Sequence, residues 1–288
     1  MTGAALALVI GAAVLHAAWN ALAKRGRDPL AFLWCSVSLA TILILPFAQA
    51  EFRAGGLPAA ALPFVIATVV LHTVYFYALG SSYRTGEFSI VYPVARGLGV
   101  ALVPVLALLF LDERLSPLGA LGVSLVVLGI VCLQFSPTAW RAAAVRQGAL
   151  GPGTRWALLT GLSIAGYSLV DKAGVARLHP VPYIFLLGLG SVLLLSPTVL
   201  ARRGALGLEW RANRWAILAA STMNLTAYLL VLFAFRLSKA GYVVAGRELS
   251  IVFSATIGTL WFREGRLAPR LAGAGIILAG VLCVALAR

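Results

Sequence analysis

The chain has 288 residues, of which 61% are hydrophobic and 11% are charged, and its formal net charge is +14. A soluble domain is typically about half apolar and a quarter charged, so too few polar side chains are present to cover a water-exposed surface. The Lys and Arg residues stand singly or in twos and threes between apolar blocks, and no basic patch interleaved with aromatic residues favours nucleic acid. The composition therefore predicts an all-α, polytopic membrane protein.

Apolar blocks follow one another along the whole chain, separated by charged or Pro/Gly-rich breaks. About 20 residues, each rising roughly 1.5 Å, cross the hydrocarbon layer of roughly 30 Å. The first block has no basic leading region, so we interpret it as a permanent helix and not as a cleaved signal peptide. The sequence predicts ten spanning helices, near 3–23, 30–48, 59–81, 88–111, 117–135, 156–176, 181–201, 214–235, 241–262 and 267–286.

The pattern of cysteines and the lack of a nucleotide-binding motif argue against several classes of cofactor site. Cys35, Cys132 and Cys283 lie in apolar spans, and their odd number and irregular spacing predict neither a disulfide framework nor a metal site. No GxxxxGK[ST] motif occurs, so we expect no direct use of ATP. We therefore expect no cofactor.

The same residues recur at the same intervals in both halves of the chain. The interval from Arg96 to Glu113 equals that from Arg247 to Glu264, and a cysteine follows each glutamate at a second shared interval. Such repetition is the first feature to look for in a sequence, because it defines the architecture. Further matches lie upstream: Lys24 with Lys172, Asp28 with His179, and Pro29 with Pro180.

These matches predict two repeats of five helices, 1–135 and 156–288, joined by a polar linker over 136–155. An odd number of spans per repeat makes the second copy enter the membrane from the opposite side, which gives an inverted repeat of the kind common in secondary transporters. The odd-numbered connections carry about twice as many Lys and Arg as the even-numbered connections and the termini. By the positive-inside rule, both termini are expected outside the cytoplasm.

Two arginines at matching positions are the first candidates for a site. Arg96 and Arg247 lie roughly 12 and 9 Å into the fourth and ninth spans, where a charged side chain is costly and is a functional candidate by default. We expect Arg96 to bind a carboxylate or phosphate of the solute through paired hydrogen bonds. Snorkelling to the membrane surface or bonding between helices is the alternative for both arginines.

Prolines and one glutamate complete the polar features of these two spans. Pro93 and Pro104 are expected to break or kink the fourth span, whereas the ninth has no proline. Glu248 is the only carboxylate well inside a span, since Asp171 lies near the end of the sixth. Adjacent helical residues point in different directions, so Glu248 and Arg247 each need a partner on another helix. Glu248 is a candidate for proton coupling, and a structural counter-ion is the alternative.

Further polar and aromatic residues in the spans are candidates to line a pocket for a polar or amphipathic solute. His16 and Asn20 share one helix face beside Trp19. Each candidate also has a bland alternative, a hydrogen bond between helices. The predicted substrate-binding set is Arg96, Arg247, His16, Trp19, Asn20, His72, Tyr75, Tyr92, Asn224 and Tyr228. Glu113 and Glu264, at span ends and followed closely by proline, are assigned to architecture.

The twin segments LFLDERLSPLGALGVSLVVLGIVCL and LWFREGRLAPRLAGAGIILAGVLCV, with AWNALAK closing the first span, resemble the EamA family of the drug/metabolite transporter superfamily. The resemblance covers about residues 3–135 and 156–286. It implies ten helices in two inverted repeats, in a bacterial inner membrane, with no enzymatic activity. It also implies secondary-active export of small metabolites such as amino acids or drug-like solutes by alternating access. The sequence departs from the family in an inserted Gly265 and in its charge distribution, because the family usually has cytoplasmic termini.

Other functions stay open at this point. A lipid-linked carrier or flippase needs a lateral opening between helices, and an assembly partner would turn Arg96 and Arg247 toward a protein interface. An intramembrane enzyme needs clustered acids, bases or metal ligands, which the spans lack. The expected partners are a small-molecule solute, the lipid bilayer and a coupling ion such as the proton, with no nucleic acid. The sequence does not fix the oligomeric state.

Overall fold

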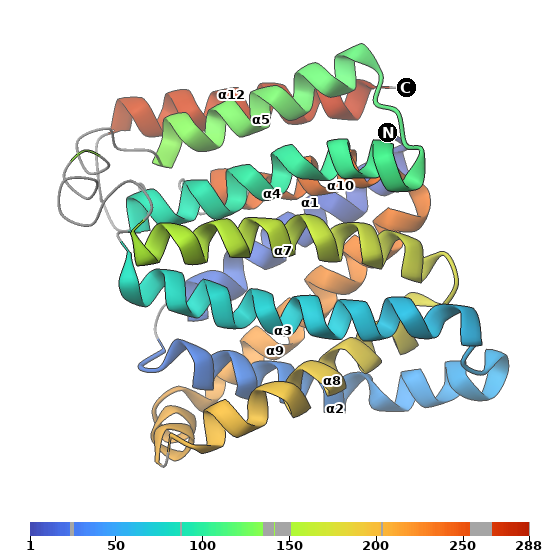
Figure 1. The fold of residues 1–288 in the computed structure, drawn as a ribbon, viewed down its shortest axis with the longest axis vertical. Coiled ribbons are helices and arrows are strands. Elements are labelled where there is room, and N and C mark those ends of the chain that lie inside the picture. The colour runs from blue at the N-terminus through green and yellow to red at the C-terminus, as the bar shows by residue number, and fades with distance from the viewer. Residues whose placement is uncertain are drawn as a thin grey trace.

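The structure is a computed structural model that describes residues 1–23, 26–86, 88–134, 141, 151–202, 204–253 and 267–287. These residues form ten α-helices and one short 3-10 helix, without a β-strand (Figure 1). The elements are α1 (Gly3–Ala23), α2 (Pro29–Gly55), η1 (Ala59–Ala61), α3 (Leu62–Thr85), α4 (Phe88–Leu111), α5 (Pro117–Gln134), α7 (Pro152–Val175), α8 (Pro180–Leu200), α9 (Ala205–Leu237), α10 (Ala240–Arg247) and α12 (Leu267–Leu286). The all-α prediction is therefore confirmed.

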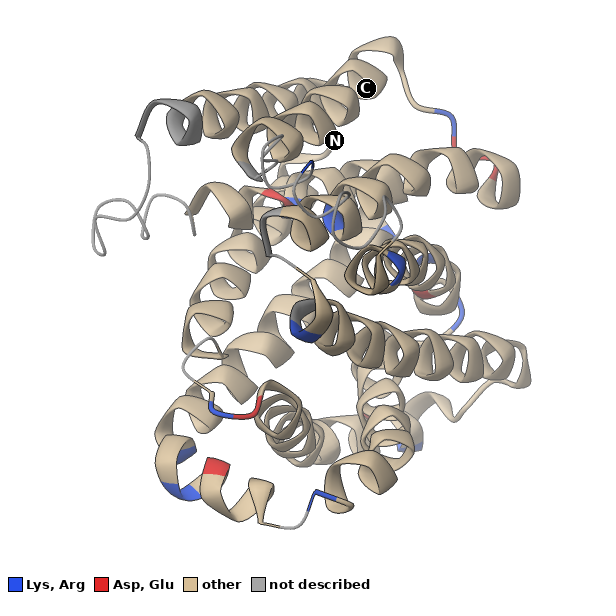
Figure 2. Ribbon diagram, turned by 60° about the vertical axis from the view of Figure 1, so that its left-hand side comes forward, with Lys and Arg blue, Asp and Glu red and all other residues tan. Residues whose placement is uncertain are grey.

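Most of these helices are built to cross a membrane. Six of the described helices, α1 to α4, α8 and α9, are long and apolar enough to span it, and α5 and α12 contain shorter apolar stretches. Charged side chains are few along the ribbon, and most lie near helix ends (Figure 2). Long apolar helices with charges at their ends suit a multi-pass membrane protein.

The eighth predicted span begins earlier than expected. Helix α9 starts at Ala205, whereas the sequence predicted a start at 214. Asn213 has non-helical backbone angles (φ −130°, ψ 18°), so the predicted start marks a kink inside a longer helix. The charged segment of α9 before the kink is bonded to the connection between α1 and α2. Buried Glu209 accepts hydrogen bonds from the amides of Arg27 and Asp28, both at 2.9 Å.

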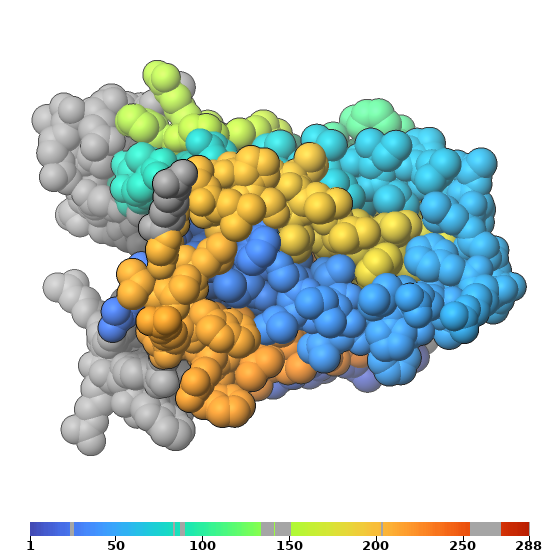
Figure 3. Space-filling view, turned by 90° about the horizontal axis from the view of Figure 1, so that it is seen from below, coloured from blue at the N-terminus to red at the C-terminus, as the bar shows by residue number. Residues whose placement is uncertain are grey.

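The helices form a bundle with one pair set apart. Helices α5 and α12 lie side by side at one edge, next to α4 and α10, and α7 packs between α3 and α4 (Figure 1). On the opposite face α2 lies between α8 and α9 (Figure 3). The two termini lie together, because the amino group of Met1 donates a 3.3 Å hydrogen bond to the carbonyl of Ala285. Both ends of the chain are thus on the same side of the helical bundle.

Two matched side-chain contacts show that equivalent helices run in opposite directions. Asp28 caps the start of α2, and its Oδ2 lies 3.2 Å from Arg202 Nη1, just beyond the end of α8. His179 caps the start of α8, and its Nδ1 lies 3.6 Å from Glu51 Oε2, in the last turns of α2. Each pair therefore joins the start of one helix to the end of the other. Helices α2 and α8 are antiparallel, as an inverted repeat requires.

Glycines let α5 and α12 approach until their backbones touch. A Cβ at Gly129 would lie 2.6 Å from the Ile277 side chain and 2.9 Å from the carbonyl oxygen of Gly273. A Cβ at Gly280 would lie 2.6 Å from the carbonyl oxygen of Gly122. Small residues at such contacts are the usual means by which membrane helices pack, since lipid offers no hydrophobic drive for association.

Asp171 ties four helices together. Its Oδ1 accepts hydrogen bonds from Thr68 Oγ1 at 2.5 Å and from the Tyr183 hydroxyl at 2.8 Å, and its Oδ2 accepts one from Tyr228. The donors belong to α3, α8 and α9, and Asp171 itself to α7. It lies one turn from the end of α7, yet it is fully buried because three other helices cover it.

This burial changes the view of Glu248 that the sequence suggested. Asp171 and Glu209 are as completely buried as Glu248, so burial does not set Glu248 apart among the carboxylates. Position along a span predicted the burial of these carboxylates poorly, because neighbouring helices cover the helix ends in this bundle.

The assignment of Glu113 to architecture fits its contacts. Glu113 Oε2 accepts a 2.6 Å hydrogen bond from the amide of Ala240 at the start of α10. Its Oε1 lies 3.4 Å from Lys172 Nζ, which also donates to the carbonyls of Phe235 and Ser238 at the end of α9. Glu113 and Lys172 thus hold the α9–α10 turn. Their counterparts Glu264 and Lys24 lie outside the described residues.

We predict that Gly129→Ala destabilises the protein by about 1–3 kcal/mol, because the added methyl group must displace the α12 backbone. Gly275→Ala, on the exposed face of α12 with nothing within 4 Å, is the matched control and should be neutral or slightly stabilising. Thermal unfolding of both variants in detergent measures the difference. Equal melting temperatures for the two variants would contradict the close α5–α12 packing.

We also predict that Asp171→Asn lowers the free energy of unfolding by about 1–3 kcal/mol, because at least one buried hydroxyl loses its acceptor. Asp112→Asn is the control, since the Asp112 side chain is 90% exposed and its φ of 52° also suits asparagine. Thermal unfolding in detergent again gives the readout. A melting temperature of Asp171→Asn that matches wild type would show that this carboxylate does not hold the four helices.

Candidate functional site

A cavity lies at the centre of the bundle, between the two repeats. It has about 870 Å³ of space that protein atoms do not fill, part of it open to the outside. Eight helices contribute to its wall, α1 to α4 and α7 to α10, whereas α5 and α12 contribute none. A mostly apolar cavity with a few polar groups is typical of a small-molecule site.

Most of the residues predicted from the sequence meet at this cavity. The wall includes His16, Trp19, His72, Tyr75, Arg96, Asn224, Tyr228 and Arg247. Asn20 does not line it, because its Nδ2 donates a 2.7 Å hydrogen bond to the carbonyl of His16 at an exposed position. Tyr92 lies one turn before Arg96 and interacts with that side chain from behind the wall. Glu248 is buried next to the wall as well.

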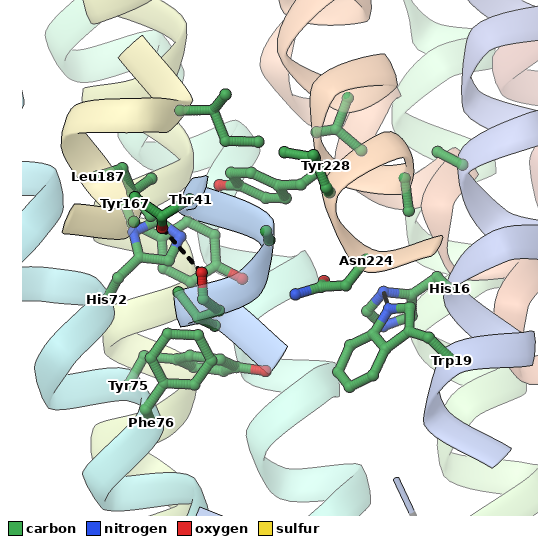
Figure 4. A pocket seen from close by; sticks show the side chains of 18 of the residues that line it. His16, Trp19, Thr41, His72, Tyr75, Phe76, Tyr167, Leu187, Asn224 and Tyr228 are labelled. Carbon is green, nitrogen blue, oxygen red and sulfur yellow. Dashed lines mark hydrogen bonds between the residues drawn. The ribbon is translucent and has the colours of Figure 1, made fainter. Parts of the chain in front are cut away.

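Aromatic side chains form two facing sides of the cavity. His72, Tyr75 and Phe76 of α3 lie opposite His16 and Trp19 of α1, with Asn224 of α9 beside the latter two (Figure 4). On the α3 side the His72 ring also stacks on Tyr167 of α7, with 4.1 Å between ring centroids. Flat rings on both sides suit a solute with an apolar or aromatic body.

Hydrogen bonds fix the tautomers of the two histidines. Trp19 Nε1 donates to His16 Nδ1 at 3.2 Å, so that nitrogen is an acceptor and the neutral ring carries its proton on Nε2. His72 Nδ1 lies 3.0 Å from the carbonyl oxygen of Thr68, which can only accept, so this nitrogen carries a hydrogen. His16 therefore adds no positive charge to the cavity.

The two arginines differ in their partners. Arg96 Nη2 lies 3.1 Å from Glu248 Oε1, and both side chains are buried. Arg247 Nη2 makes one long hydrogen bond, 3.4 Å, to the Tyr167 hydroxyl. As expected for neighbours in a helix, Arg247 and Glu248 find partners on other helices. Arg96 lines the cavity and also contacts Glu248, so the binding of a solute carboxylate or phosphate by Arg96 stays a prediction.

Among the described residues the helix is interrupted in the ninth span and not at Pro93, while a kink at Pro93 stays a prediction. Helix α4 runs without interruption from Phe88 to Leu111 with both prolines inside it, since a proline removes one hydrogen bond without having to end a membrane helix. Helix α10 instead ends at Arg247, Glu248 forms a turn, and residues 249–253 are helical again.

Sequence reasoning missed several residues of the site. Tyr167, Phe76 and Thr41 line the cavity, and Asp171 holds Tyr228 from behind. For Tyr167 a signal was present: the interval that separates Arg96 from Arg247 also separates His16 from Tyr167. Among the described residues, no group of three or more His, Cys, Asp and Glu side chains is placed to hold a metal ion.

Comparisons with known proteins agree with this architecture. A crystal structure of another protein superposes with a TM-score of 0.76 over 99% of each chain at 15% sequence identity, so the two share a fold. The nicotine metabolites export pump subunit NepA of Paenarthrobacter nicotinovorans is 39% identical over 69 residues, which are 24% of this chain and 60% of that protein. The model of the EamA-like transporter family matches residues 3–135 and 151–286. The chain therefore belongs to the EamA-like transporter family.

Proposed function

We propose that the protein is a secondary-active carrier that exports a small organic solute across the cytoplasmic membrane of a bacterium. The observation that carries this proposal is the central cavity, whose wall draws on four helices of each repeat and includes the matched arginines. A site shared by two inverted halves can be exposed to either side when one half rocks against the other. Family membership and the export pump relative support transport in the same sense.

The polar groups around the cavity supply the proposed recognition of the solute. Arg96, Arg247, His16, Asn224 and Tyr228 offer hydrogen bonds, and the aromatic side chains cover the apolar part of the solute. Amphipathic metabolites and drug-like compounds of this kind are the proposed cargo. Most of the wall residues come from the interior of long helices, so the proposed solute site lies between the two membrane surfaces.

Glu248 is the proposed coupling group. Its Oε1 pairs with Arg96, and its buried Oε2 has no hydrogen-bond partner among the described residues. A proton that neutralises Glu248 releases Arg96, and the positive charge of Arg96 then acts on the cavity. Proton uptake and solute binding are linked through this pair, which is the kind of differential interaction that coupling requires.

Uptake and efflux of labelled organic solutes in proteoliposomes, with and without a pH gradient, test this function. We predict that wild type moves at least one compound in response to the gradient, and that Arg96→Gln lowers the flux about ten-fold or more, because it leaves Glu248 buried without a counter-ion. The double variant Arg96→Gln/Glu248→Gln controls for folding and should regain thermal stability without regaining gradient-driven flux. Normal flux in Arg96→Gln would contradict the proposed role of this pair.

A further inference from the structure

The charges at the cavity are unevenly distributed. Among the described residues that line it, Arg96 and Arg247 are the charged side chains, and no Asp or Glu is part of the wall. Glu248 offsets one of the two positive charges through its 3.1 Å contact with Arg96. The arginine–glutamate group therefore leaves one positive charge that no carboxylate in contact with it balances.

The positive charge without a carboxylate partner belongs to Arg247. Its side chain is buried, with 3% of the residue exposed, and its Nε has no hydrogen-bond partner among the described residues. Its one hydrogen bond within the described residues goes to a neutral hydroxyl, that of Tyr167. A buried guanidinium without an anion is costly, and its planar set of donors fits a carboxylate in a two-pronged arrangement. The side chain is thus a built receptor for an anionic group.

Asp171 does not provide the missing anion. Three hydroxyl groups donate to its two oxygens, and it lies behind Tyr228, outside the wall of the cavity. For the same reason it is not available to the ammonium group of a solute. An amine entering the cavity would lose its hydration and meet two guanidinium groups, with no Asp or Glu among the described wall residues.

We propose that the cavity selects an organic monoanion with an aromatic or branched apolar body, whose carboxylate is bound by Arg247, and that it discriminates against amines. This inference rests on the proposed carrier function and names its substrate class. The body of the solute lies between the Tyr75–Phe76 side and the Trp19 side of the cavity. The neutral His16 and the Asn224 amide add hydrogen-bond donors without adding charge.

The test uses three probes that share a phenylalkyl body and differ in charge: 3-phenylpropanoate, phenylalanine and 3-phenylpropylamine. Their binding to the full-length protein in lipid nanodiscs is measured by calorimetry. We expect the anion to bind about ten-fold or more tightly than the zwitterion or the amine. The amine has no carboxylate to pair with Arg247, and the zwitterion carries an ammonium group that the two guanidinium groups repel. Arg247→Gln should remove this preference, and Arg247→Lys should keep part of it.

Arg177→Gln is the matched control, because Arg177 is exposed and rests on the Phe64 ring outside the cavity wall, so the preference should persist. Equal or tighter binding of the amine by wild type, an unchanged preference in a folded Arg247→Gln, or no binding of any probe would overturn the proposal. Flux measurements separate it from the carrier function. Transport of the amine without the anion would support the carrier function and overturn the anion selectivity. Anion binding through Arg247 without any transport would support the anion selectivity and overturn the carrier function.

Discussion

The need to balance buried charge governs the centre of this protein. Two guanidinium groups and one carboxylate lie out of water between the two repeats, and an ion moved into such surroundings without a partner costs several kcal/mol. Glu248 meets this need for Arg96 through its 3.1 Å contact. Arg247 is left with one neutral partner, so the fold keeps an unbalanced charge at the place where a solute can supply the counter-ion.

The two repeats match in their helical framework but differ in the carboxylates at and near the site. One interval relates Asp28 to His179 and Arg96 to Arg247, and it also relates Gly97 to Glu248 and Asn20 to Asp171. The first two matches preserve the framework: helix caps in one case and guanidiniums in the other. The last two place a carboxylate in the second repeat where the first has none. Asp171 and Glu248 thus belong to the second repeat, and each makes contacts with helices of the first.

The sequence predicted the fold well because hydropathy and repetition are properties of the chain itself. Span bounds agreed within about four residues, except that α2 continues to Gly55 and that Asn213 kinks a longer α9. The end of the ninth predicted span lies outside the described residues. The sequence predicted the site less well because contacts between helices depend on packing. The pairing of Arg96 with Glu248 and the hydroxyl donors around Asp171 join residues far apart in the sequence. Tyr167 is an intermediate case, since the repeat interval links it to His16.

In the proposed carrier, the cavity between the repeats opens in turn to both sides of the membrane. Thr41→Cys, in a background where Cys35, Cys132 and Cys283 are replaced by serine, places one thiol on the cavity wall. Its reaction with a membrane-impermeant thiol reagent, applied from either side of oriented vesicles, measures access directly. We expect reaction from both sides, and slower reaction in the presence of a transported solute. Reaction from one side alone under every condition would contradict alternating access.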